Sequence, residues 1–274
     1  MTRKAKKSDI IRDFCTELRL RAIAEHFEEL EKTATDYEDF LYQLLSYESE
    51  AAEKKLVESR IRCAGFPCRK YLEDLEIEKL PVGIQRALPE ISTLRFIEQG
   101  QNLIFVGNPG TGKTHTAIGL GIKACQRGYR VLFTTIPLLI TELKECRNER
   151  RLSAFQKRFS KYDLVIADEL GYLTFDREGS ELLFTCLSSR SLEKSIIITS
   201  NLTFERWSEI FGDAAVTGAM VDRLTYGAKL IDAEGPSYRL LQTLRTNGID
   251  SIDQLHEEDE AAKALVADAE GSVA

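Results

Sequence analysis

The sequence predicts an α/β fold, a parallel sheet flanked by helices, preceded by a small, entirely helical domain. Short apolar runs alternate with helical stretches through the middle of the chain, which is typical of buried parallel strands joined by helices. A glycine-rich turn follows the first of these runs, and helical signals with few breakers dominate the residues before about 80. The runs that we interpret as strands are residues 102–106, 129–134, 162–167 and 195–200.

The helical domain is expected to cover residues 1–80. Ser8 is a candidate N-cap for a first helical stretch, and a second helix is expected at residues 37–62, where the sequence Gly-Phe-Pro at 65–67 follows. Apolar residues with helical spacing predict a buried face on each stretch. The positions in the first stretch are Ile11, Phe14, Leu18, Ile23, Phe27 and Leu30, and those in the second are Phe40, Leu41, Leu44, Leu45, Ala52, Leu56 and Val57.

Residues 107–114 read GNPGTGKT and match the pattern G-x-x-x-x-G-K-[ST] completely. They follow an expected strand and open an expected helix, which is the context that a phosphate-binding loop requires. The bare backbone N–H groups of such a turn can wrap phosphate oxygens, and the helix points its positive end at the same anion. We therefore expect a nucleotide site whose loop residues are Gly107, Asn108, Pro109, Gly110, Thr111, Gly112, Lys113, Thr114 and His115.

Within this loop, Lys113 is expected to reach the β- and γ-phosphates, and the Thr114 hydroxyl is expected to sit on Mg²⁺. Asp168 and Glu169 directly follow the apolar run 162–167. Because parallel strands present ligands at their carboxyl ends, Asp168 is placed to hold Mg²⁺ and Glu169 to activate a water for attack on the γ-phosphate. The alternative is an acidic turn after a buried strand.

Three further polar residues are candidates for the reaction. Asn201 follows the run 195–200, where its amide could hydrogen-bond the γ-phosphate or the attacking water, or simply form a turn. Arg223 and Arg239 lie downstream, and an arginine from a neighbouring subunit can neutralise charge that develops on a transferring phosphoryl group. For Arg223 the alternative is a surface ion pair with Asp222 or another nearby acid.

A resemblance to a known family is carried by five ordered segments: GNPGTGKT, LVIADELGYL, IIITSN, FGDAAVTGAMVDRL and GPSYRL. They resemble the AAA+ ATPases of the IstB family, helper proteins of bacterial transposons that are related to the DnaC helicase loaders. The resemblance is densest over residues 100–240. It implies an AAA+ P-loop domain, which we place at residues 81–245, with ATP and Mg²⁺ as cofactors.

Carried over by position, the resemblance implies that Asp168 and Glu169 form the acid pair and that Asn201 is the first sensor. Arg223 resembles the family's arginine finger, which acts on the nucleotide of the neighbouring subunit. Arg239 is either a second sensor that acts in its own chain or a residue that finishes the last strand. The implied function is an ATP-driven homo-oligomer, with nucleotide at its subunit interfaces, that assembles on double-stranded DNA and engages a transposase.

Three other kinds of ATP-binding protein are the alternatives. A DnaC-like replicative helicase loader would use the same ATPase, but it would dock on a helicase and favour single strands. A metabolic kinase would need a lid over a small-substrate pocket, and the sequence offers no candidate segment. A scaffold that binds ATP without hydrolysing it is disfavoured by the presence of Asp168, Glu169 and Asn201 together.

A basic segment at residues 137–161 is the best candidate for a nucleic-acid surface. On one continuous helix, Lys144, Arg147 and Arg151 would lie at i, i+3 and i+7, so that three charges could follow a phosphate backbone. With Arg150, these are the residues that we expect to bind DNA. No recognition-helix pattern or aromatic stacking pattern accompanies them, so binding is expected to be independent of sequence and sensitive to salt. The alternative is a solvated basic helix face.

Charge and composition restrict the remaining possibilities. The 274 residues carry a net charge of −7, but eight acids and one lysine in residues 246–274 account for all of it, leaving residues 1–245 neutral. That stretch is expected to be a disordered acidic tail. The six cysteines form no C-x-x-C pair, which disfavours a thiolate metal site. No long apolar run or signal sequence is present, so we expect a cytoplasmic protein without membrane contact.

Overall fold

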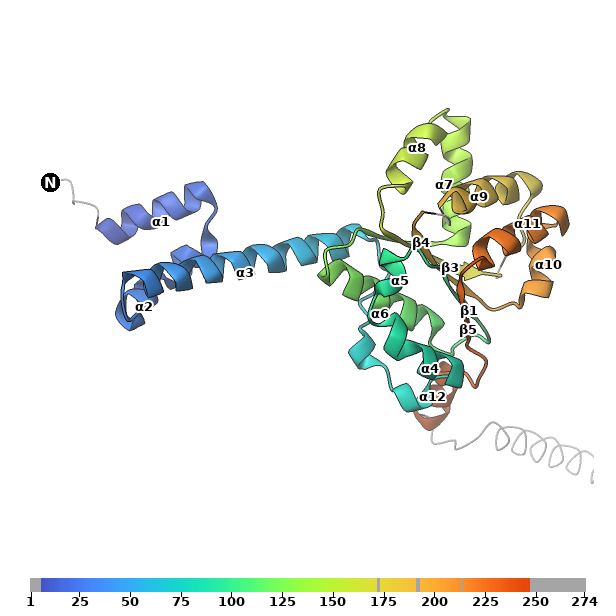
Figure 1. The fold of residues 1–274 in the computed structure, drawn as a ribbon, viewed down its shortest axis with the longest axis horizontal. Helices are drawn as coiled ribbons and strands as arrows, with labels where there is room; N and C mark the ends of the chain where they lie inside the picture. The colour runs from blue at the N-terminus through green and yellow to red at the C-terminus, as the bar shows by residue number, and fades with distance from the viewer. Residues whose placement is uncertain (1–5, 172, 191–192, 213, 247–274) are drawn as a thin grey trace, which may run out of the picture. The chain divides into compact units, whose positions relative to one another are not determined.

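The computed structural model describes residues 6–171, 173–190, 193–212 and 214–246, and its ribbon is drawn in Figure 1. The chain divides into two compact units, Met1–Arg62 and Cys63–Ala274, which we call the N-terminal and C-terminal units. Apart from Thr246, the expected acidic tail at residues 246–274 lies outside the described residues.

The N-terminal unit contains three helices, α1 (Lys7–Leu18), α2 (Arg21–Thr33) and α3 (Tyr37–Cys63). The first expected stretch is broken because Arg19, with φ 64°, ends α1 in the left-handed conformation. The buried cluster of the N-terminal unit consists of Phe27, Leu30 and Leu44, with Ile23 and Phe40 packed against them.

This cluster is too small to cover the apolar faces that the helical spacing predicts. Several residues that were expected to be buried are exposed, and the prediction is wrong for them. The largest are Ile11, Phe14, Leu18, Leu41, Leu45 and Leu56. Helical spacing shows which side of a helix is apolar, but it does not show whether another element of the same unit covers that side.

The C-terminal unit is built on a five-stranded parallel sheet with the strand order β2-β3-β4-β1-β5. All four expected strands are confirmed. The sequence analysis did not predict the fifth strand, which pairs with β1 at the edge of the sheet. The strand bounds are β1 (Leu103–Val106), β2 (Val131–Thr135), β3 (Leu164–Leu170), β4 (Ser195–Ser200) and β5 (Lys229–Asp232).

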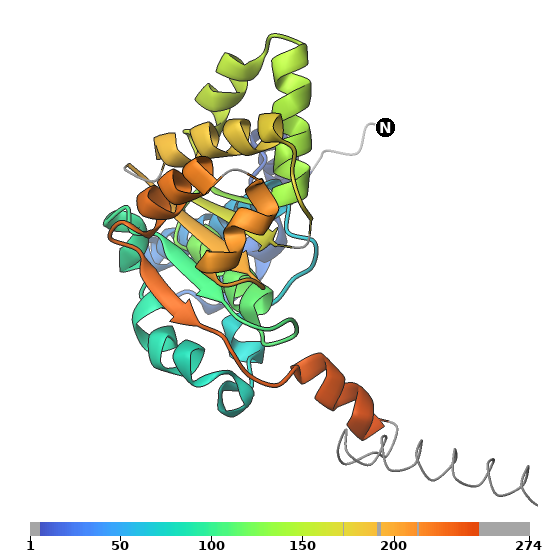
Figure 2. The same ribbon diagram turned by 90° about the vertical axis from the view of Figure 1, so that its right-hand side faces the viewer.

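Helices cover both faces of this sheet, as the two views in Figures 1 and 2 show. The α-helices are α4 (Val82–Ile91), α5 (Arg95–Glu98), α6 (Lys113–Gln126), α7 (Ile136–Asn148), α8 (Leu152–Phe159), α9 (Arg177–Arg190), α10 (Trp207–Phe211), α11 (Ala214–Thr225) and α12 (Tyr238–Thr246). Short 3-10 helices are η1 (Leu72–Asp74), η2 (Ile77–Lys79) and η3 (Phe204–Arg206). Helix α6 packs on β2, β3 and β4 from one face, while α7 packs on the sheet and on α9 from the other. None of the helices in the described residues combines the length and apolar character needed to cross a bilayer.

The segment that follows α3 belongs to the C-terminal unit. The Phe133 N–H donates to Ala64 O at 2.7 Å, and the Tyr71 carbonyl oxygen lies 3.0 Å from His115 Nε2. Leu72 packs so closely on α6 that a Cβ added at Gly119 would lie 2.7 Å from its Cδ2. Because these contacts tie the segment to the sheet and α6, the boundary between the units falls after Arg62, earlier than the expected boundary at residue 80.

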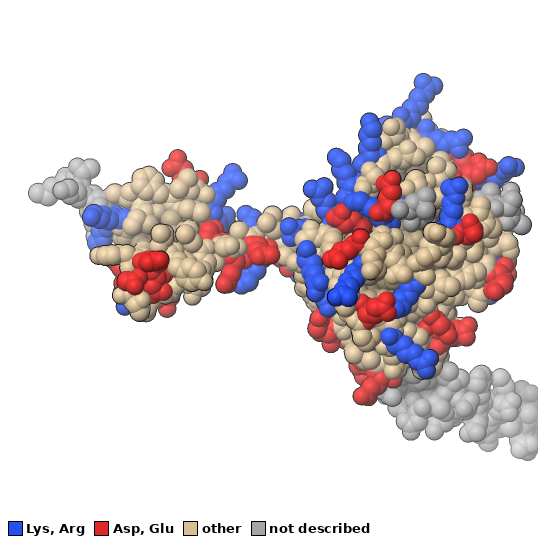
Figure 3. Space-filling model, viewed as in Figure 1, with Lys and Arg blue, Asp and Glu red and all other residues tan. Residues whose placement is uncertain are grey.

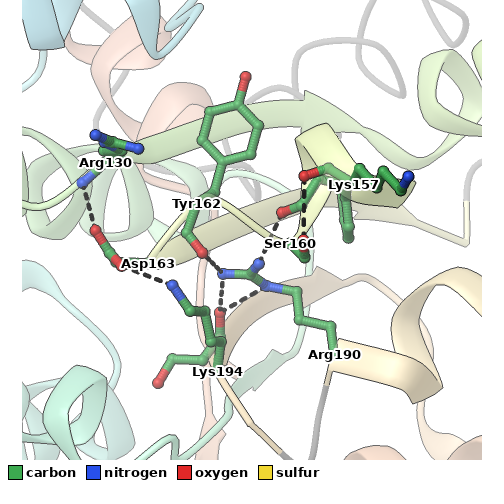
Figure 4. Close-up of polar contacts among 9 residues, drawn as sticks. Arg130, Lys157, Ser160, Tyr162, Asp163, Arg190 and Lys194 are labelled. Atoms are coloured by element: carbon green, nitrogen blue, oxygen red, sulfur yellow. Dashed lines mark hydrogen bonds and ion pairs between the residues drawn. The ribbon is translucent and has the colours of Figure 1, made fainter. Parts of the chain in front are cut away.

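The buried Arg190 side chain forms hydrogen bonds at the amino edge of the sheet, which is the edge at which the strands begin (Figure 4). The Arg190 guanidinium donates to Phe159 O at 3.1 Å, Tyr162 O at 2.7 Å and Ser195 O at 3.4 Å. Burial lowers the pKa of Arg190 to about 10. These bonds join the end of α9 to the end of α8 and to the start of β4. The structure thereby fixes the α8 segment against the sheet.

Candidate functional site

The phosphate loop lies at the carboxyl edge of the sheet, between β1 and α6. Gly110 has φ 81° and Gly112 has φ 91°, in the left-handed region that favours glycine. At Gly110 space also favours glycine, since an added Cβ would lie 2.1 Å from Ser237 Oγ and 3.0 Å from Ser237 Cβ. At Gly112 an added Cβ would meet only the flexible end of Leu80, at 2.8 Å, so there the backbone conformation is the reason for glycine.

Lys113 begins α6 and turns its amine into the loop. Its Nζ donates to Gly107 O at 2.7 Å and to Asn108 O at 2.6 Å, and the residue is 8% exposed. Burial lowers the pKa of Lys113 to about 8, with the charge of Asp168 opposing this shift and that of Arg239 adding to it. The amine is thus a cation at neutral pH, held among carbonyl oxygens where an anion would be a stronger partner.

The two residues predicted to hold Mg²⁺ lie in contact. The Thr114 hydroxyl donates to Asp168 Oδ1 at 2.9 Å, and Asp168 is 3% exposed at the end of β3. The Thr199 hydroxyl, on the neighbouring strand β4, donates to the same oxygen. Thr199 was not among the site residues expected from the sequence, although a threonine near the carboxyl end of an otherwise apolar run was an available signal. A hydroxyl and a carboxylate oxygen side by side suit a hard cation such as Mg²⁺.

Glu169 lies in a bulge of β3. The strand register shifts between Ala167 and Leu170, and Glu169 has φ 65°, which is unusual for a residue with a side chain. Its N–H donates to Thr199 Oγ1 at 3.1 Å. The bulge leaves Glu169 exposed between two buried neighbours, Asp168 and Leu170. The five preceding residues of β3, 164–168, are all buried, so the strand first turns a side chain out to solvent at the bulge.

Asn201 directly follows β4, the strand beside β3. Its Oδ1 is buried and has no hydrogen-bond partner in the part of the chain that the structure describes. A Cβ at Gly171 would lie 2.2 Å from this oxygen, so the close approach depends on that glycine. A buried amide oxygen without a partner is costly, and it suits a donor from outside the chain, such as a water molecule. The site residues therefore fit a bound nucleotide with its attacking water.

The two candidate arginines occupy different settings. Arg223 is exposed on α11, with its guanidinium carbon 5.2 Å from the centroid of the Phe184 ring. Within the described residues it forms no ion pair, so the structure does not contain the pairing with Asp222 that was the alternative. Arg239 lies on α12, after the last strand has ended at Asp232, so of its two alternatives the one in which it finishes that strand is wrong. Its charge acts on Lys113 of the same chain.

A segment near the end of the described chain crosses over the phosphate loop. The Tyr238 N–H donates to Gly110 O at 2.9 Å, and Asn108 Nδ2 donates to Gly235 O at 3.4 Å. The Tyr238 hydroxyl donates to Glu76 Oε1 at 2.5 Å, and Lys79 Nζ lies 5.6 Å from the centroid of the Tyr238 ring. The loop is therefore held between residues 71–80 and 233–239, a pairing that the sequence analysis did not predict.

The basic segment does not form the single helix face that was predicted. Helix α7 ends at Asn148, Arg150 has φ 56°, and Arg151 lies at the start of α8. Lys144 and Arg147 share α7, but Arg151 cannot continue their row because the chain turns between the two helices. The prediction of one continuous row of three charges is therefore wrong.

Ion pairs also neutralise much of this surface. Lys144 pairs with Asp176 at 2.6 Å and Arg147 with Glu178 at 3.2 Å, while Arg151 pairs with Glu149 and Arg158 with Glu142. Figure 3 shows Lys and Arg side chains gathered over α7 and α8 with acidic side chains among them. Among the described residues of this segment, the cations that form no ion pair are Arg150, Lys157 and Lys161.

Comparisons with known proteins support the nucleotide site. A sequence profile described as "IstB-like ATP binding protein" matches residues 14–246. The ATP-binding protein of insertion sequence IS21 from Pseudomonas aeruginosa is 37% identical over 227 residues, which cover 81% of this chain and 86% of that protein. The ATP-binding protein of insertion sequence IS5376 from Geobacillus stearothermophilus is 34% identical over 234 residues, covering 84% of this chain and 93% of that protein.

Among solved structures, DnaI is similar in fold, with a TM-score of 0.52 and 20% identity over 60% of this chain and 90% of that one. This likeness concerns the arrangement of the sheet and its helices. The profile match covers most of the chain, including the phosphate loop, Asp168 in β3 and Asn201 directly after β4. The chain belongs to the IstB-like ATP-binding proteins and is an ATPase of the AAA+ class.

Proposed function

We propose that the protein assembles on duplex DNA in an ATP-dependent manner, without sequence preference, and recruits or activates a transposase there. The similarity to ATP-binding proteins of insertion sequences over more than four fifths of the chain carries this proposal. The exposed Arg223 supports the assembly, because it offers a cation for a site that lies outside its own phosphate loop.

At the phosphate loop, Lys113, Thr114 and Asp168 hold the nucleotide and Mg²⁺ in this proposal. Bound Mg·ATP supplies a phosphoryl group for transfer to water, with the metal neutralising negative charge on the phosphates. The Lys113 amine exchanges its carbonyl partners for phosphate oxygens, which offer it stronger charge-assisted hydrogen bonds. Thr199 holds the Asp168 carboxylate in position through its hydroxyl, which donates to Oδ1.

Glu169 and Asn201 act on the attacking water in this proposal. The bulge in β3 exposes the Glu169 carboxylate, so that it can accept the proton of the water. The unpartnered Asn201 Oδ1 accepts a hydrogen bond from the same water and orients it. A carboxylate and an amide together fix both the proton acceptor and the direction of attack.

Arg223 acts in trans and Arg239 in cis. Arg223 of one subunit neutralises charge on the nucleotide held by the next, so that nucleotide binding and subunit association form one linked equilibrium. Arg239 already influences Lys113 within its own chain, which supports a contact with the same nucleotide. ATP then favours the oligomer, and hydrolysis dissolves it.

Lys144, Arg147, Arg150 and Arg151 form the DNA-binding surface in this proposal. Arg150 forms no ion pair among the described residues, whereas the other three must exchange carboxylate partners for phosphates. This exchange makes their contribution smaller than the count of charges suggests. Binding is expected to be sensitive to salt because it depends on the phosphate backbone.

The test is fluorescence anisotropy of labelled duplex and single-stranded DNA with ATP, with ADP and without nucleotide, at two salt concentrations. ATP-dependent, salt-sensitive binding to duplex is expected.

A second test uses a variant of the exposed carboxylate. Glu169→Gln should bind ATP but retain the DNA-bound oligomer, because hydrolysis no longer dissolves it, whereas Glu181→Gln on the exposed face of α9 should behave as wild type. A preference for single strands would favour the helicase-loader alternative, and turnover by Glu169→Gln at the wild-type rate would contradict the role of this carboxylate.

A further inference from the structure

A polar cavity lies at the amino edge of the sheet, far along the strands from the phosphate loop. Helix α5 leads directly into β1, and the last turn of α6 returns to the same edge before β2 begins. The cavity has a volume of about 480 Å³. We call it the amino-edge pocket, and its lining residues are Pro89, Ser92, Thr93, Arg95, Glu98, Lys123 and Arg127.

Three of the lining residues are cations that lie on different parts of the chain. Arg95 begins α5, Lys123 lies in the last turn of α6, and Arg127 directly follows α6. Arg127 Nη1 donates to Thr93 O at 3.1 Å, which holds its guanidinium at the pocket. Within the described residues, none of the three forms an ion pair. The pocket therefore gathers three cations without the carboxylate partners that neutralise the α7–α8 surface.

The one acid of the pocket does not cancel this charge. The Glu98 carboxylate accepts a hydrogen bond from the Tyr129 hydroxyl at 3.2 Å, which directs it to a neutral partner. The net charge of the lining is therefore positive, with two hydroxyl groups, from Ser92 and Thr93, beside the cations. In Figure 3, Lys and Arg side chains lie over the positions that α5 and α6 occupy in Figure 1.

A second cavity at the same edge, of about 360 Å³, holds, besides the carbonyl-bound Arg190, one cation without an ion pair among the described residues, Lys157, against three in the amino-edge pocket. The Arg190 guanidinium in its wall already donates to three backbone carbonyls (Figure 4), and Lys194 pairs with Asp163 at 2.8 Å. Its remaining basic residue is Lys157. Of these two cavities, the amino-edge pocket is therefore the one in which several unpaired cations line a concave surface.

The chemistry of the amino-edge pocket favours phosphate groups without a base. Guanidinium and ammonium groups bind phosphate oxygens through charge-assisted hydrogen bonds. The Thr93 hydroxyl already donates to Glu90 O at 2.7 Å, so the Ser92 hydroxyl is the neutral donor that the lining can offer. The lining contains no aromatic ring on which a base could stack. Three cations drawn from separate elements suit successive phosphates of a backbone, a contact that positions nucleic acid without reading its sequence.

We propose that the amino-edge pocket binds phosphodiester groups of duplex DNA through Arg95, Lys123 and Arg127. This inference rests on the proposed function, because it adds a second contact to the DNA that the oligomer holds. The pocket lies at the edge opposite the nucleotide, so DNA bound there leaves the phosphate loop open. It also supplies charge that the paired cations of α7 and α8 do not.

The first test compares salt dependence of duplex binding with ATP present. The triple variant Arg95→Gln, Lys123→Gln and Arg127→Gln should lower the magnitude of the slope of log K against log salt by about 0.9 for each lost phosphate contact, or about 2.7 in total. The matched control, Lys54→Gln, Lys55→Gln and Arg62→Gln, removes three exposed charges from α3 and should leave the slope unchanged. Circular dichroism checks that each variant melts cooperatively, and the single variants carry the test if the triple variant does not.

The second test uses the wild-type protein. Duplex DNA should slow the labelling of the Lys123 amine by an amine-reactive reagent several-fold, as measured by mass spectrometry, while Lys54 is labelled at an unchanged rate. Inorganic tripolyphosphate serves as a small polyanion in a parallel reaction. Protection of Lys123 by tripolyphosphate but not by duplex would assign the pocket to a small anion and overturn the proposal.

The outcomes separate this inference from the proposed function. If wild-type protein binds duplex and the pocket variants keep its slope, the pocket proposal fails and the proposed function stands. If wild-type protein binds no DNA in any nucleotide state, both fail together. A reduced slope in the pocket variants, with an unchanged slope in the α3 control, supports the pocket as a phosphate contact.

Discussion

Replacing Lys113 by methionine should stabilise the folded protein while abolishing ATP binding. The Lys113 amine is buried beside the phosphate loop, and burial lowers its pKa from 10.5 to about 8. At neutral pH the amine is still protonated, so the folded chain holds a cation in a setting that disfavours it. Methionine has a similar length and carries no charge, so it removes this cost together with the group proposed to bind the phosphates.

The size of the effect follows from the pKa. Each unit corresponds to about 1.36 kcal/mol, so the shift amounts to about 3 kcal/mol against the charged form. The substitution also removes two hydrogen bonds, from Nζ to Gly107 O and Asn108 O, each of which contributes roughly 0.5–1.5 kcal/mol net, so that together they offset the gain by about 1–3 kcal/mol. A net gain of up to about 2 kcal/mol remains, which raises the melting temperature by up to roughly 6 °C for a unit of this size.

The pH dependence of the stability difference provides a second, independent test of the prediction. Because the folded-state pKa lies below the unfolded value of 10.5, the cost is fully present below about pH 8 and disappears as the pH rises toward 10.5. The advantage of Lys113→Met over wild type should therefore shrink between these values. Melting curves at about pH 7 and about pH 10 measure it, with Lys70→Met, at an exposed position, as the control. A variant less stable than wild type at neutral pH, or an advantage that does not change with pH, would refute the reasoning.

Three more substitutions test the surroundings of the site. Glu169→Gly should relieve the left-handed backbone at φ 65° and raise the unfolding free energy by about 0.5–1 kcal/mol, yet abolish ATP turnover; a melting temperature equal to that of Glu169→Gln would contradict the strain. Thr199→Val removes a hydroxyl donor to Asp168, so the Mg²⁺ concentration for half-maximal turnover should rise by roughly 10-fold or more, and an unchanged Mg²⁺ titration would count against this positioning role. Arg190→Met removes the donor to the Phe159 carbonyl at the end of α8 and to the Tyr162 carbonyl just before β3, and it should lower the urea-unfolding free energy by about 2–4 kcal/mol; a loss below about 1 kcal/mol would show that water satisfies these carbonyls.

The strands could be predicted because a buried parallel strand is almost wholly apolar. The four predicted runs have this character, and the phosphate-loop motif fixes the order of the first strand and helix. The strand β5 escaped prediction because it is short and lies at the sheet edge, where only Ile231 of its residues is buried. An edge strand is less buried than a central strand, so its sequence needs neither a long apolar run nor a regular alternation of apolar and polar residues.

Helix α12 shows how a local signal was available but misread. Pro236 ends the preceding extended segment, and the Ser237 hydroxyl accepts a hydrogen bond from the Leu240 N–H at 3.3 Å, as an N-cap does. Serine after proline at the start of a helix is a recognisable pattern. The resulting helix carries Arg239 beside the phosphate loop, so the cap decides whether this arginine can act in its own chain.

That the motif residues would lie near one another was predictable, but the contacts between them and their supporting partners were not. Thr114 and Asp168 are far apart in sequence, and only the neighbouring positions of β1 and β3 around β4 bring them together with Thr199. The contact of Tyr238 with Gly110 likewise depends on how the chain returns after β5. Such contacts follow from strand order, which a motif in one segment does not encode.

The basic segment shows why local charge is a poor guide to a binding surface. Seven cations against three acids predict a strongly positive surface in residues 137–161, but the neighbouring α9 region supplies Asp176 and Glu178 to pair with two of them. Exposed pairs of this kind contribute little stability, yet they reduce the potential that a phosphate meets. Cations drawn together from separate segments, as in the amino-edge pocket, can remain unpaired although no segment is strongly basic by itself. The surface that binds a polyanion is therefore decided by which acids the fold brings near, and a comparison of charge removal at the two places measures that difference directly.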